Sequence, residues 1–325
     1  MNNTSTVSSL QEKSKANQDP APHSSTKVKE EITFEPITLE TLKRFQEYYP
    51  INHFELSDLS PASLWVWRTP YKVSWSIIEG LFCFRCHHED ETYYLPPVGA
   101  NYEKFAHVLQ TLKVTAEGSG HPLRFRAIPR EMLTRINMVT GQSVNTAEDR
   151  ANWDYLYLTQ DLIDLKGRKY QHIRNQINKF ENVYQYEYVP MKPEDFPQVE
   201  AIFSSWAAVH SDELTVSDER EALHEAFVSF EQLNLKGGMI LVGDEAVAFS
   251  IGSSLKDDTV QIHFQKARPE YNGAYALVSR EFIAHSWHQT TYVNWEDDLG
   301  LPGLREAKRR YHPIKMVEKY IVDLV

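Results

Sequence analysis

Three strand-like runs follow one another in the second half of the chain, at residues 239–242, 246–255 and 259–265. β-Branched and aromatic residues are common in them, and residues 259–265 alternate between apolar and polar side chains. They are followed by a helical run at 271–288, a strand at 291–296, a basic helix at 304–311 and a terminal strand. This order predicts an α/β unit in which a mixed sheet is flanked by helices.

The first half repeats the order of strands followed by helices. A helix is predicted at residues 38–49, strands at 63–67, 72–78, 81–86, 92–95 and 123–127, and helices at about 102–112 and from about Pro129. We therefore predict two α/β units in tandem, at residues 32–150 and 151–325. Residues 1–31 carry almost no large apolar side chain, so we expect a disordered tail there.

Composition narrows the classes of partner. The 325 residues have a formal net charge of −11, which argues against a general affinity for nucleic acid or for an anionic membrane surface. No run is long and apolar enough for a spanning helix, and the N-terminus lacks the apolar core of a signal peptide. With only two cysteines, the chain is expected to work in the reducing cytoplasm.

The run Cys83-Phe84-Arg85-Cys86-His87 matches the attachment pattern of a c-type haem, and His88 adds a fourth zinc-ligand type. Because the run lies in a predicted strand, residues three apart point to opposite faces of the sheet. Structural zinc sites also usually draw their ligands from two separate segments. We therefore expect reduced cysteines and no metal.

Two basic segments interrupt the acidic chain. Residues 166–179 carry five Lys or Arg and no acid, with apolar residues at helical spacing, and residues 305–310 form a second basic run. Each segment is either a solvated helix face or a contact for phosphates. The phosphates can belong to a nucleotide or to an RNA such as tRNA.

The strand at 259–265 and the turn after it carry the candidate chemistry. Alternation places Val260, Ile262 and Phe264 on one face, and Gln261, His263 and Gln265 on the other. A strand, a turn containing Gly273 and a helix start then follow, an order that presents free backbone N–H groups to an anion.

Several stretches resemble one protein family. They are residues 155–158, 167–169, 174–180, 248–252, 263–267, 271–275, 292–300 and 303–308, with Glu281, Phe282, Tyr311, Pro313, Lys319 and Tyr320. From about Ile32 to its end, the chain resembles the C-terminal domain family of the phosphatidylglycerol lysyltransferases, whose short members long carried only a domain-of-unknown-function label. The resemblance implies two GNAT-like acyltransferase units in tandem, as in the Fem-type peptidoglycan aminoacyltransferases.

The resemblance also implies transfer of an acyl or aminoacyl group, from acyl-CoA or aminoacyl-tRNA, to an amine or hydroxyl. The acceptor can be a small molecule, a peptide or a lipid, and no tightly bound cofactor is expected. A non-catalytic ligand- or protein-binding module on the same scaffold is the alternative.

Acyl transfer needs a base, a proton donor and groups that hold the donor. The catalytic candidates are His263, Glu296, Asp297 and Tyr311. The candidates for binding the donor are Lys266, Arg268, Asn272, Gly273, Ala274, Tyr275, Asn294 and Lys308. If the chain is an enzyme, we expect four of them to converge on one pocket beside Gly273, namely His263, Asn294, Glu296 and Tyr311.

Overall fold

The computed structural model describes residues 32–47, 55–141, 144–210 and 216–324. The expected tail at 1–31 and the end of the helix expected at 38–49 therefore lie outside the described residues. The first half contains β1 (Glu35–Pro36), α1 (Leu39–Gln46), η1 (Ser57–Leu59), α3 (Pro61–Val66), β2 (Ser74–Ile78), β3 (Leu81–His88), β4 (Glu91–Tyr94), α4 (Phe105–Gly118), β5 (Leu123–Ile128), α5 (Arg130–Thr140), β6 (Asn145–Glu148) and η2 (Arg150–Asn152).

The second half begins at the next strand. It contains β7 (Asp154–Leu158), α6 (Thr159–Asp164), η3 (Arg168–Tyr170), α7 (Gln171–Glu181), β8 (Glu187–Pro190), η4 (Pro193–Asp195), α8 (Phe196–Ala208), α9 (Val216–Val228), β9 (Lys236–Val242), β10 (Glu245–Lys256), β11 (Thr259–Ala267), α10 (Ala274–Ser286), β12 (Tyr292–Asn294), α11 (Pro302–Arg309), β13 (Lys315–Val317) and β14 (Tyr320–Leu324).

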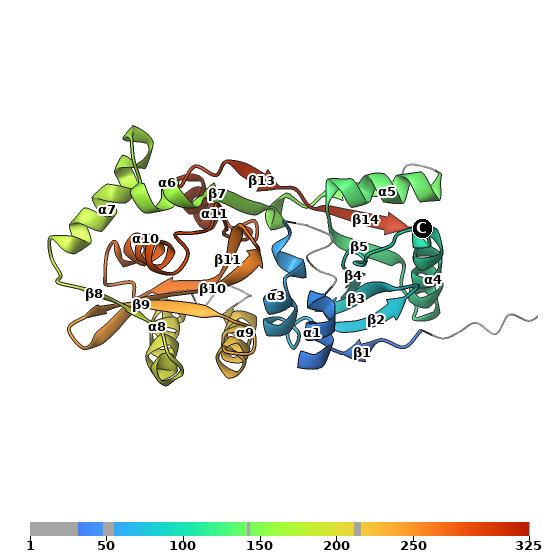
Figure 1. The fold of residues 1–325 in the computed structure, drawn as a ribbon, viewed down its shortest axis with the longest axis horizontal. Helices are drawn as coiled ribbons and strands as arrows, with labels where there is room; N and C mark the ends of the chain where they lie inside the picture. The colour runs from blue at the N-terminus through green and yellow to red at the C-terminus, as the bar shows by residue number, and fades with distance from the viewer. Residues whose placement is uncertain (1–31, 48–54, 142–143, 211–215, 325) are drawn as a thin grey trace, which may run out of the picture. The chain divides into compact units, whose positions relative to one another are not determined.

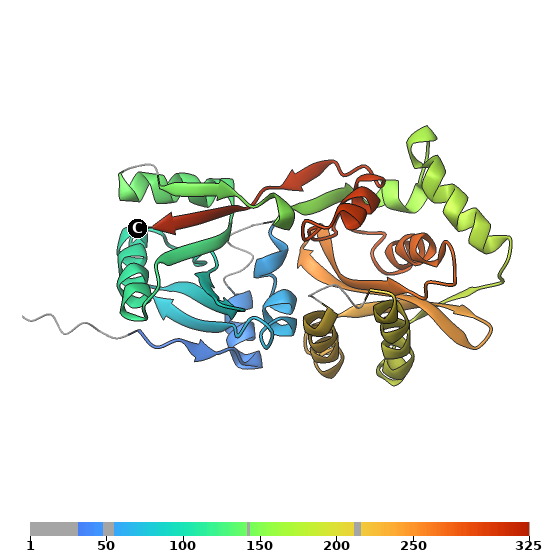
Figure 2. The same ribbon diagram turned by 180° about the vertical axis from the view of Figure 1, so that it is seen from behind.

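The strands form two seven-stranded sheets with the same internal order (Figures 1 and 2). One sheet runs β1-β2-β3-β4-β5-β14-β6, and the other, read from its far edge, runs β8-β9-β10-β11-β12-β7-β13. In each sheet the fourth and fifth strands are parallel and the other pairs are antiparallel. The chain is therefore two copies of one mixed α/β unit, which confirms the predicted fold class.

The two copies exchange one strand each. β7 follows the first sheet in sequence but lies between β12 and β13, and β14 follows the second sheet but lies between β5 and β6. We call residues 32–148 with β14 the first unit and residues 154–317 the second unit. Residues 32–325 form one compact body. The division at residue 150 stays a prediction, because the exchanged strands belong to both halves.

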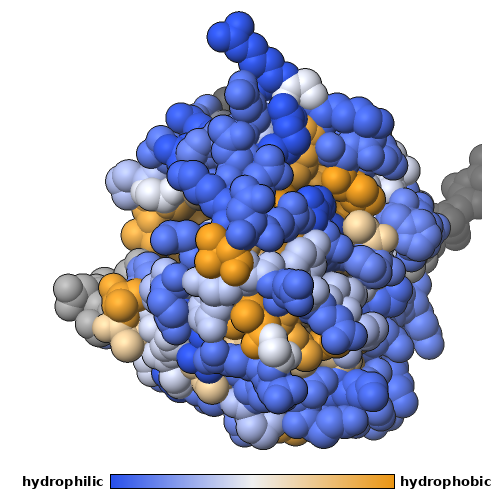
Figure 3. Space-filling model, turned by 90° about the vertical axis from the view of Figure 1, so that its left-hand side faces the viewer, coloured by the Kyte–Doolittle hydropathy of each residue, from blue (hydrophilic) through white to orange (hydrophobic). Residues whose placement is uncertain are grey.

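Helices cover the sheets in matching places. α4 and α10 each connect the two parallel strands of their sheet, and the segments with α1 and α3, or with α8 and α9, connect the first two strands. α6, η3 and α7 have no counterpart among the described residues of the first unit. α7 packs on α10 and lies at the outer end of the second unit, where Figure 3 shows a mostly hydrophilic surface.

The strand predicted at residues 63–67 is wrong, because these residues belong mostly to helix α3. The Ser60 side chain accepts a hydrogen bond from the Ser63 N–H, and Pro61 occupies the first turn, where its missing N–H is not needed. Leu64, Trp65 and Val66 are buried. Their apolar character suits a buried helix as well as a strand.

Candidate active site

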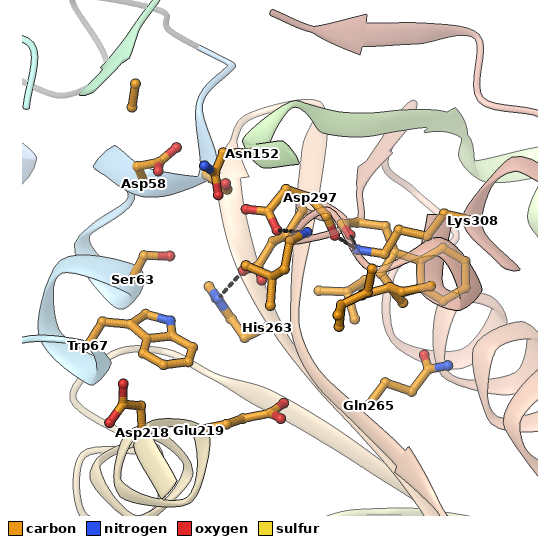
Figure 4. A pocket seen from close by; sticks show the side chains of 18 of the residues that line it. Asp58, Ser63, Trp67, Asn152, Asp218, Glu219, His263, Gln265, Asp297 and Lys308 are labelled. Carbon is orange, nitrogen blue, oxygen red and sulfur yellow. Dashed lines mark hydrogen bonds and ion pairs between the residues drawn. The ribbon is translucent and has the colours of Figure 1, made fainter. Parts of the chain in front are cut away.

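A cavity of about 690 Å³ lies where β11 and β12 diverge. The two strands pair at only three positions, Thr259 to Gln261 with Tyr292 to Asn294, and β11 then continues to Ala267 paired with β10 but not with β12. The walls come from the end of β11, from residues 295–297 after β12, from α11, and from η1, α3 and β3 to β5 of the first unit. Figure 4 shows side chains from both units facing this space.

A bulge in β11 sets the direction of His263. Ile251 of β10 pairs with Phe264 and Gly252 pairs with Ile262, so His263 is an extra residue on its strand. His263 and Phe264 therefore share a face, and Phe264 stacks on Trp67, the residue after α3. Gln265 instead donates a 2.7 Å hydrogen bond to Ser279 Oγ on α10. The strict alternation predicted for residues 259–265 is wrong beyond the bulge.

The first unit has a similar irregularity without acid–base groups. Leu95 N donates to Phe84 O, and Val98 pairs with Phe82, so Pro96 and Pro97 together stand opposite one residue. Proline carries neither a side-chain base nor a free N–H. The titratable side chains at the end of β11 thus distinguish the second unit from the first.

Glu296 and His263 form a pair inside the cavity. His263 Nδ1 lies 3.3 Å from Glu296 Oε1, and His263 Nε2 lies 2.8 Å from Ser253 Oγ. Gln261 Nε2 donates to the same Glu296 oxygen at 2.7 Å. His263 Nε2 is therefore engaged, whereas the buried Nδ1 approaches Glu296 without making a hydrogen bond among the described residues. The second carboxylate oxygen of Glu296 has no hydrogen bond within the described part of the chain.

Asp297 is the neighbouring carboxylate. Burial raises its pKa to about 7, although Lys319 and Lys308 oppose this rise. Lys308 does not reach the carboxylate, since its Nζ donates to the backbone carbonyl oxygens of Trp295, at 2.5 Å, and of Asp297. Lys308 thus holds residues 295–297 in place rather than meeting a phosphate, and Asp297 is half ionised near neutral pH.

The loop after β12 is held by a buried carboxylate. Glu296 and Leu299 have left-handed backbone angles, with φ of 51° and 49°, which non-glycine residues adopt at a cost. Asp298 is fully buried and accepts hydrogen bonds from Arg305, Arg150 and Tyr155. Burial pushes the pKa of Asp298 upward, but the hydrogen bonds from Arg305 and Tyr155 bring it down to about 2.

Two tyrosines complete the second unit's side of the cavity. Burial raises the pKa of Tyr311 to about 12, so its hydroxyl stays protonated and can donate a hydrogen bond. The Tyr275 hydroxyl donates to the Gln265 carbonyl oxygen. All four residues predicted to be catalytic, His263, Glu296, Asp297 and Tyr311, line this one cavity.

The residues predicted to bind the donor are divided. Lys266, Tyr275 and Lys308 line the cavity. Asn294 is buried beneath it, where it binds Asp154, the Glu55 carbonyl oxygen and the Glu296 N–H. Arg268, Asn272, Gly273 and Ala274 are not among the lining residues.

Gly273 serves the packing of two helices. Its φ is 95°, and a Cβ built on it would lie 2.2 Å from the carbonyl oxygen of Gln176 on α7. The absence of a side chain therefore brings α7 close to the start of α10. The predicted approach of the cavity residues to Gly273 does not occur, because α7 takes that place.

Several cavity residues had no signal in the sequence. They come mainly from the first unit and from α9, and they are Asp58, Ser63, Trp67, Tyr71, Arg126, Asn152, Asp218 and Glu219. Asp218 pairs with His88 at 2.8 Å, Glu219 with Lys266 at 2.6 Å and Asp58 with Lys319 at 2.5 Å. These residues come from separate elements and share no periodic pattern, so they could be found only from the packing.

The cysteines lie in separate cores. Cys83 packs in the core under α4, and Cys86 packs in the core that includes α1 and α3. Burial raises the pKa of the Cys86 thiol to about 12, so it stays protonated. Across residues 32–324, apart from the gaps stated above, no group of three or more His, Cys, Asp or Glu is arranged to hold a metal ion.

The two basic segments meet on the surface. Arg310 Nη1, just after α11, lies 3.3 Å from His172 Nε2 of α7. His312 Nε2 lies 3.0 Å from the Lys169 carbonyl oxygen. α11 connects this surface to the cavity, because Leu304 and Lys308 line the cavity while Arg309 and Arg310 are exposed.

A comparison with models of protein families shows which family the chain belongs to. The family model described as phosphatidylglycerol lysyltransferase, C-terminal, matches residues 51–323. The chain belongs to this family. The resemblance drawn from the sequence motifs is thereby confirmed.

Three similar proteins extend the comparison. A protein of unknown function from Bacteroides thetaiotaomicron VPI-5482 is 33% identical, with a TM-score of 0.84 over 90% of this chain and 100% of that one. L-PGS from Bacillus licheniformis is 14% identical, with a TM-score of 0.63 over 90% of this chain and 94% of that one. An uncharacterized protein of Mycoplasmoides gallisepticum is 21% identical over 53% of this chain and 56% of its own length, about half of either.

The described helices include none with the length and apolar character that crossing a bilayer requires.

Proposed function

We propose that this chain transfers an acyl or aminoacyl group from a phosphate-rich carrier to an amine or hydroxyl acceptor. The observation that carries the proposal is the convergence of His263, Glu296, Asp297 and Tyr311 in one cavity where β11 and β12 diverge. A proton acceptor, a proton donor and a partly water-excluded space are what acyl transfer requires.

Each residue has a role in this scheme. Asp297, half ionised near neutral pH, takes the proton from the attacking group of the acceptor. Tyr311 keeps its proton and donates a hydrogen bond to the developing oxyanion or to the leaving oxygen. Glu296, oriented by Gln261 and His263, holds the acceptor. Lys308 fixes the loop that carries both carboxylates.

Aminoacyl-tRNA is the donor that the surface supports best. The start of α10, where a strand, turn and helix can bind a small phosphate, is packed against α7 at Gly273. The cations instead lie on the outer faces of α7 and α11. Arg168, Lys179 and Arg309 are exposed and have no ion-pair partner among residues 32–324 outside the gaps. A spread of free cations suits an RNA backbone better than one pyrophosphate.

Transfer is tested with both carriers. The purified chain is incubated with total tRNA charged with labelled amino acids, or with labelled acetyl-CoA, together with the twenty amino acids, glycerol and glycerol 3-phosphate. We expect label to leave tRNA, and Asp297→Asn, which removes the proposed base, to slow this at least about 100-fold. Label that stays on both carriers would instead favour a non-catalytic binding module.

The docking surface has its own test. Arg168→Glu with Arg309→Glu should weaken tRNA binding and reduce the dependence of log affinity on log salt concentration by about one to two. The charge-matched control, Lys43→Glu with Lys192→Glu, should leave both unchanged. Equal losses in the two double variants would mean that only net charge matters. A cytoplasmic location stays a prediction.

A further inference from the structure

The cavity continues from the proposed chemistry into the first unit. There its walls are mainly apolar or aromatic side chains, namely Leu64, Trp67, Tyr71, Val73, Tyr93 and Leu95. Such walls favour an apolar body of moderate size over a sugar or a long polar chain. This compartment is separate from the outer faces of α7 and α11, so the proposed donor surface does not account for it.

One guanidinium faces this compartment. Arg126 of β5 lines the cavity beside Tyr93, with its Cζ 5.2 Å from the ring centre. Its Nη2 lies 3.3 Å from a Glu91 oxygen, but its Nε is buried without a hydrogen-bond partner among the described residues. A buried donor of this kind is costly unless a ligand satisfies it. A planar guanidinium suits an anion with two oxygens.

The carboxylates of the cavity differ in their partners. Asp58, Asp218 and Glu219 each have a cationic or imidazole partner within 2.8 Å. Asp297 has no such side chain within ion-pair distance among the described residues, and its Oδ1 accepts only from the Leu299 N–H. Asp297 therefore remains free to accept from a ligand ammonium group. The cavity thus carries, at Arg126, a cationic side chain with an unsatisfied buried donor and, at Asp297, a carboxylate without a cationic partner.

We propose that the acceptor is a zwitterion with an apolar body, a free amino acid or a short peptide, whose carboxylate binds Arg126 and whose amine faces Asp297. This inference rests on the proposed function. The acceptor ammonium first gives one proton to solvent, and the amine nitrogen then attacks the donor ester carbonyl. A C–N bond forms and the C–O bond to the carrier breaks. The second amine proton passes to Asp297 and from there to the leaving oxygen, so the products are an amide and a free carrier hydroxyl.

Binding without any donor tests the proposal. Calorimetry compares L-leucine and leucyl-leucine with their amides, which lack the carboxylate, and with their N-acetyl forms, which lack the basic amine. We expect saturable binding of the amino acid or the dipeptide, and at least about tenfold weaker binding of both altered forms. Whichever of L-leucine and leucyl-leucine binds with the higher affinity shows whether the acceptor is an amino acid or a peptide.

Arg126→Met gives the decisive comparison. It should weaken binding of the free acid about tenfold and leave binding of the amide unchanged, so that acid and amide become equal. Arg130→Met, on the exposed first turn of α5, is the matched control and should change neither. An equal effect of Arg126→Met on acid and amide would overturn the proposal. So would Arg126-dependent binding of glycerol 3-phosphate with no binding of leucine or leucyl-leucine.

The two proposals fail in different ways. If charged tRNA loses its label but no zwitterion binds, the acceptor proposal falls and the transferase proposal stands. If the zwitterions bind through Arg126 but label never leaves either carrier, the transferase proposal falls, and the cavity is a binding site for amino acids or peptides.

Discussion

Replacing Asp297 by asparagine should stabilise the folded chain at neutral pH while removing the proposed base. The pKa of Asp297 is raised from 3.8 to about 7 in the folded chain, so the unfolded chain ionises this group more readily. Stability from this group is present below pH 4 and is lost as pH rises to 7, at about 1.4 kcal/mol per pH unit. Ionising Asp297 in the folded chain would thus lower the free energy of unfolding by about 4 kcal/mol in full. Because water in the cavity screens the charge, we expect about half of this loss.

Urea unfolding measures this effect. Asp297→Asn should exceed the unmodified chain in free energy of unfolding by about 2 kcal/mol at pH 8, and the difference should shrink as the pH falls toward 4. Transfer activity should fall at least about 100-fold in the same variant. In the unmodified chain, activity should rise about tenfold per pH unit below pH 7 and then level off.

The adjacent aspartate is the matched control. Asp298 has a lowered pKa of about 2, so Asp298→Asn should cost about 2 kcal/mol at pH 7, with the loss disappearing as the pH falls from about 4 toward 2. The two isosteric substitutions, at neighbouring positions, should thus change the free energy of unfolding in opposite directions near neutral pH. A destabilised Asp297→Asn, or a difference that does not depend on pH, would refute the reasoning about burial of Asp297.

Three further substitutions or probes test the fold. Gly273→Ala should cost about 2–4 kcal/mol by urea unfolding, because its φ is 95° and its Cβ would meet Gln176 O; an unchanged stability would show that α7 shifts easily. Lys319→Met should cost about 3–5 kcal/mol, since it leaves Asp58 and Asp154 without their buried cation; a neutral result would count against a charged Lys319. Both cysteines should resist a thiol reagent until the chain unfolds, and rapid labelling of the native chain would contradict their burial.

The repeated order of strands and helices could be predicted because it depends on local patterns. Strands β2 to β5 and β9 to β11 all lie where alternating or β-branched runs placed them, within a few residues. The exchange of β7 and β14 could not be predicted, since the sequence of a short strand does not determine which sheet the strand joins. Residues 63–67 show the same limit, because a short apolar run fits a buried helix or a strand.

The candidate site divides in a similar way. His263, Glu296, Asp297 and Tyr311 lie in segments whose motifs match the family, and the structure brings them to one cavity. The direction of Gln265 depends on an extra residue in β11, which becomes visible only from the pairing with β10. The sequence did not indicate which side chains of the first unit line the cavity. Single residues such as Arg126 can be recognised as candidates only once the cavity around them is known.

The central claim is that acyl transfer occurs where β11 and β12 diverge. The most direct measurement is a crystal structure with a non-hydrolysable 3′-aminoacylamido adenosine, a mimic of the charged tRNA end. We predict density for its amide between Asp297 and Tyr311, with the adenosine directed toward α11. Density at the start of α10 near Gly273, or an empty cavity at saturating ligand, would contradict the claim.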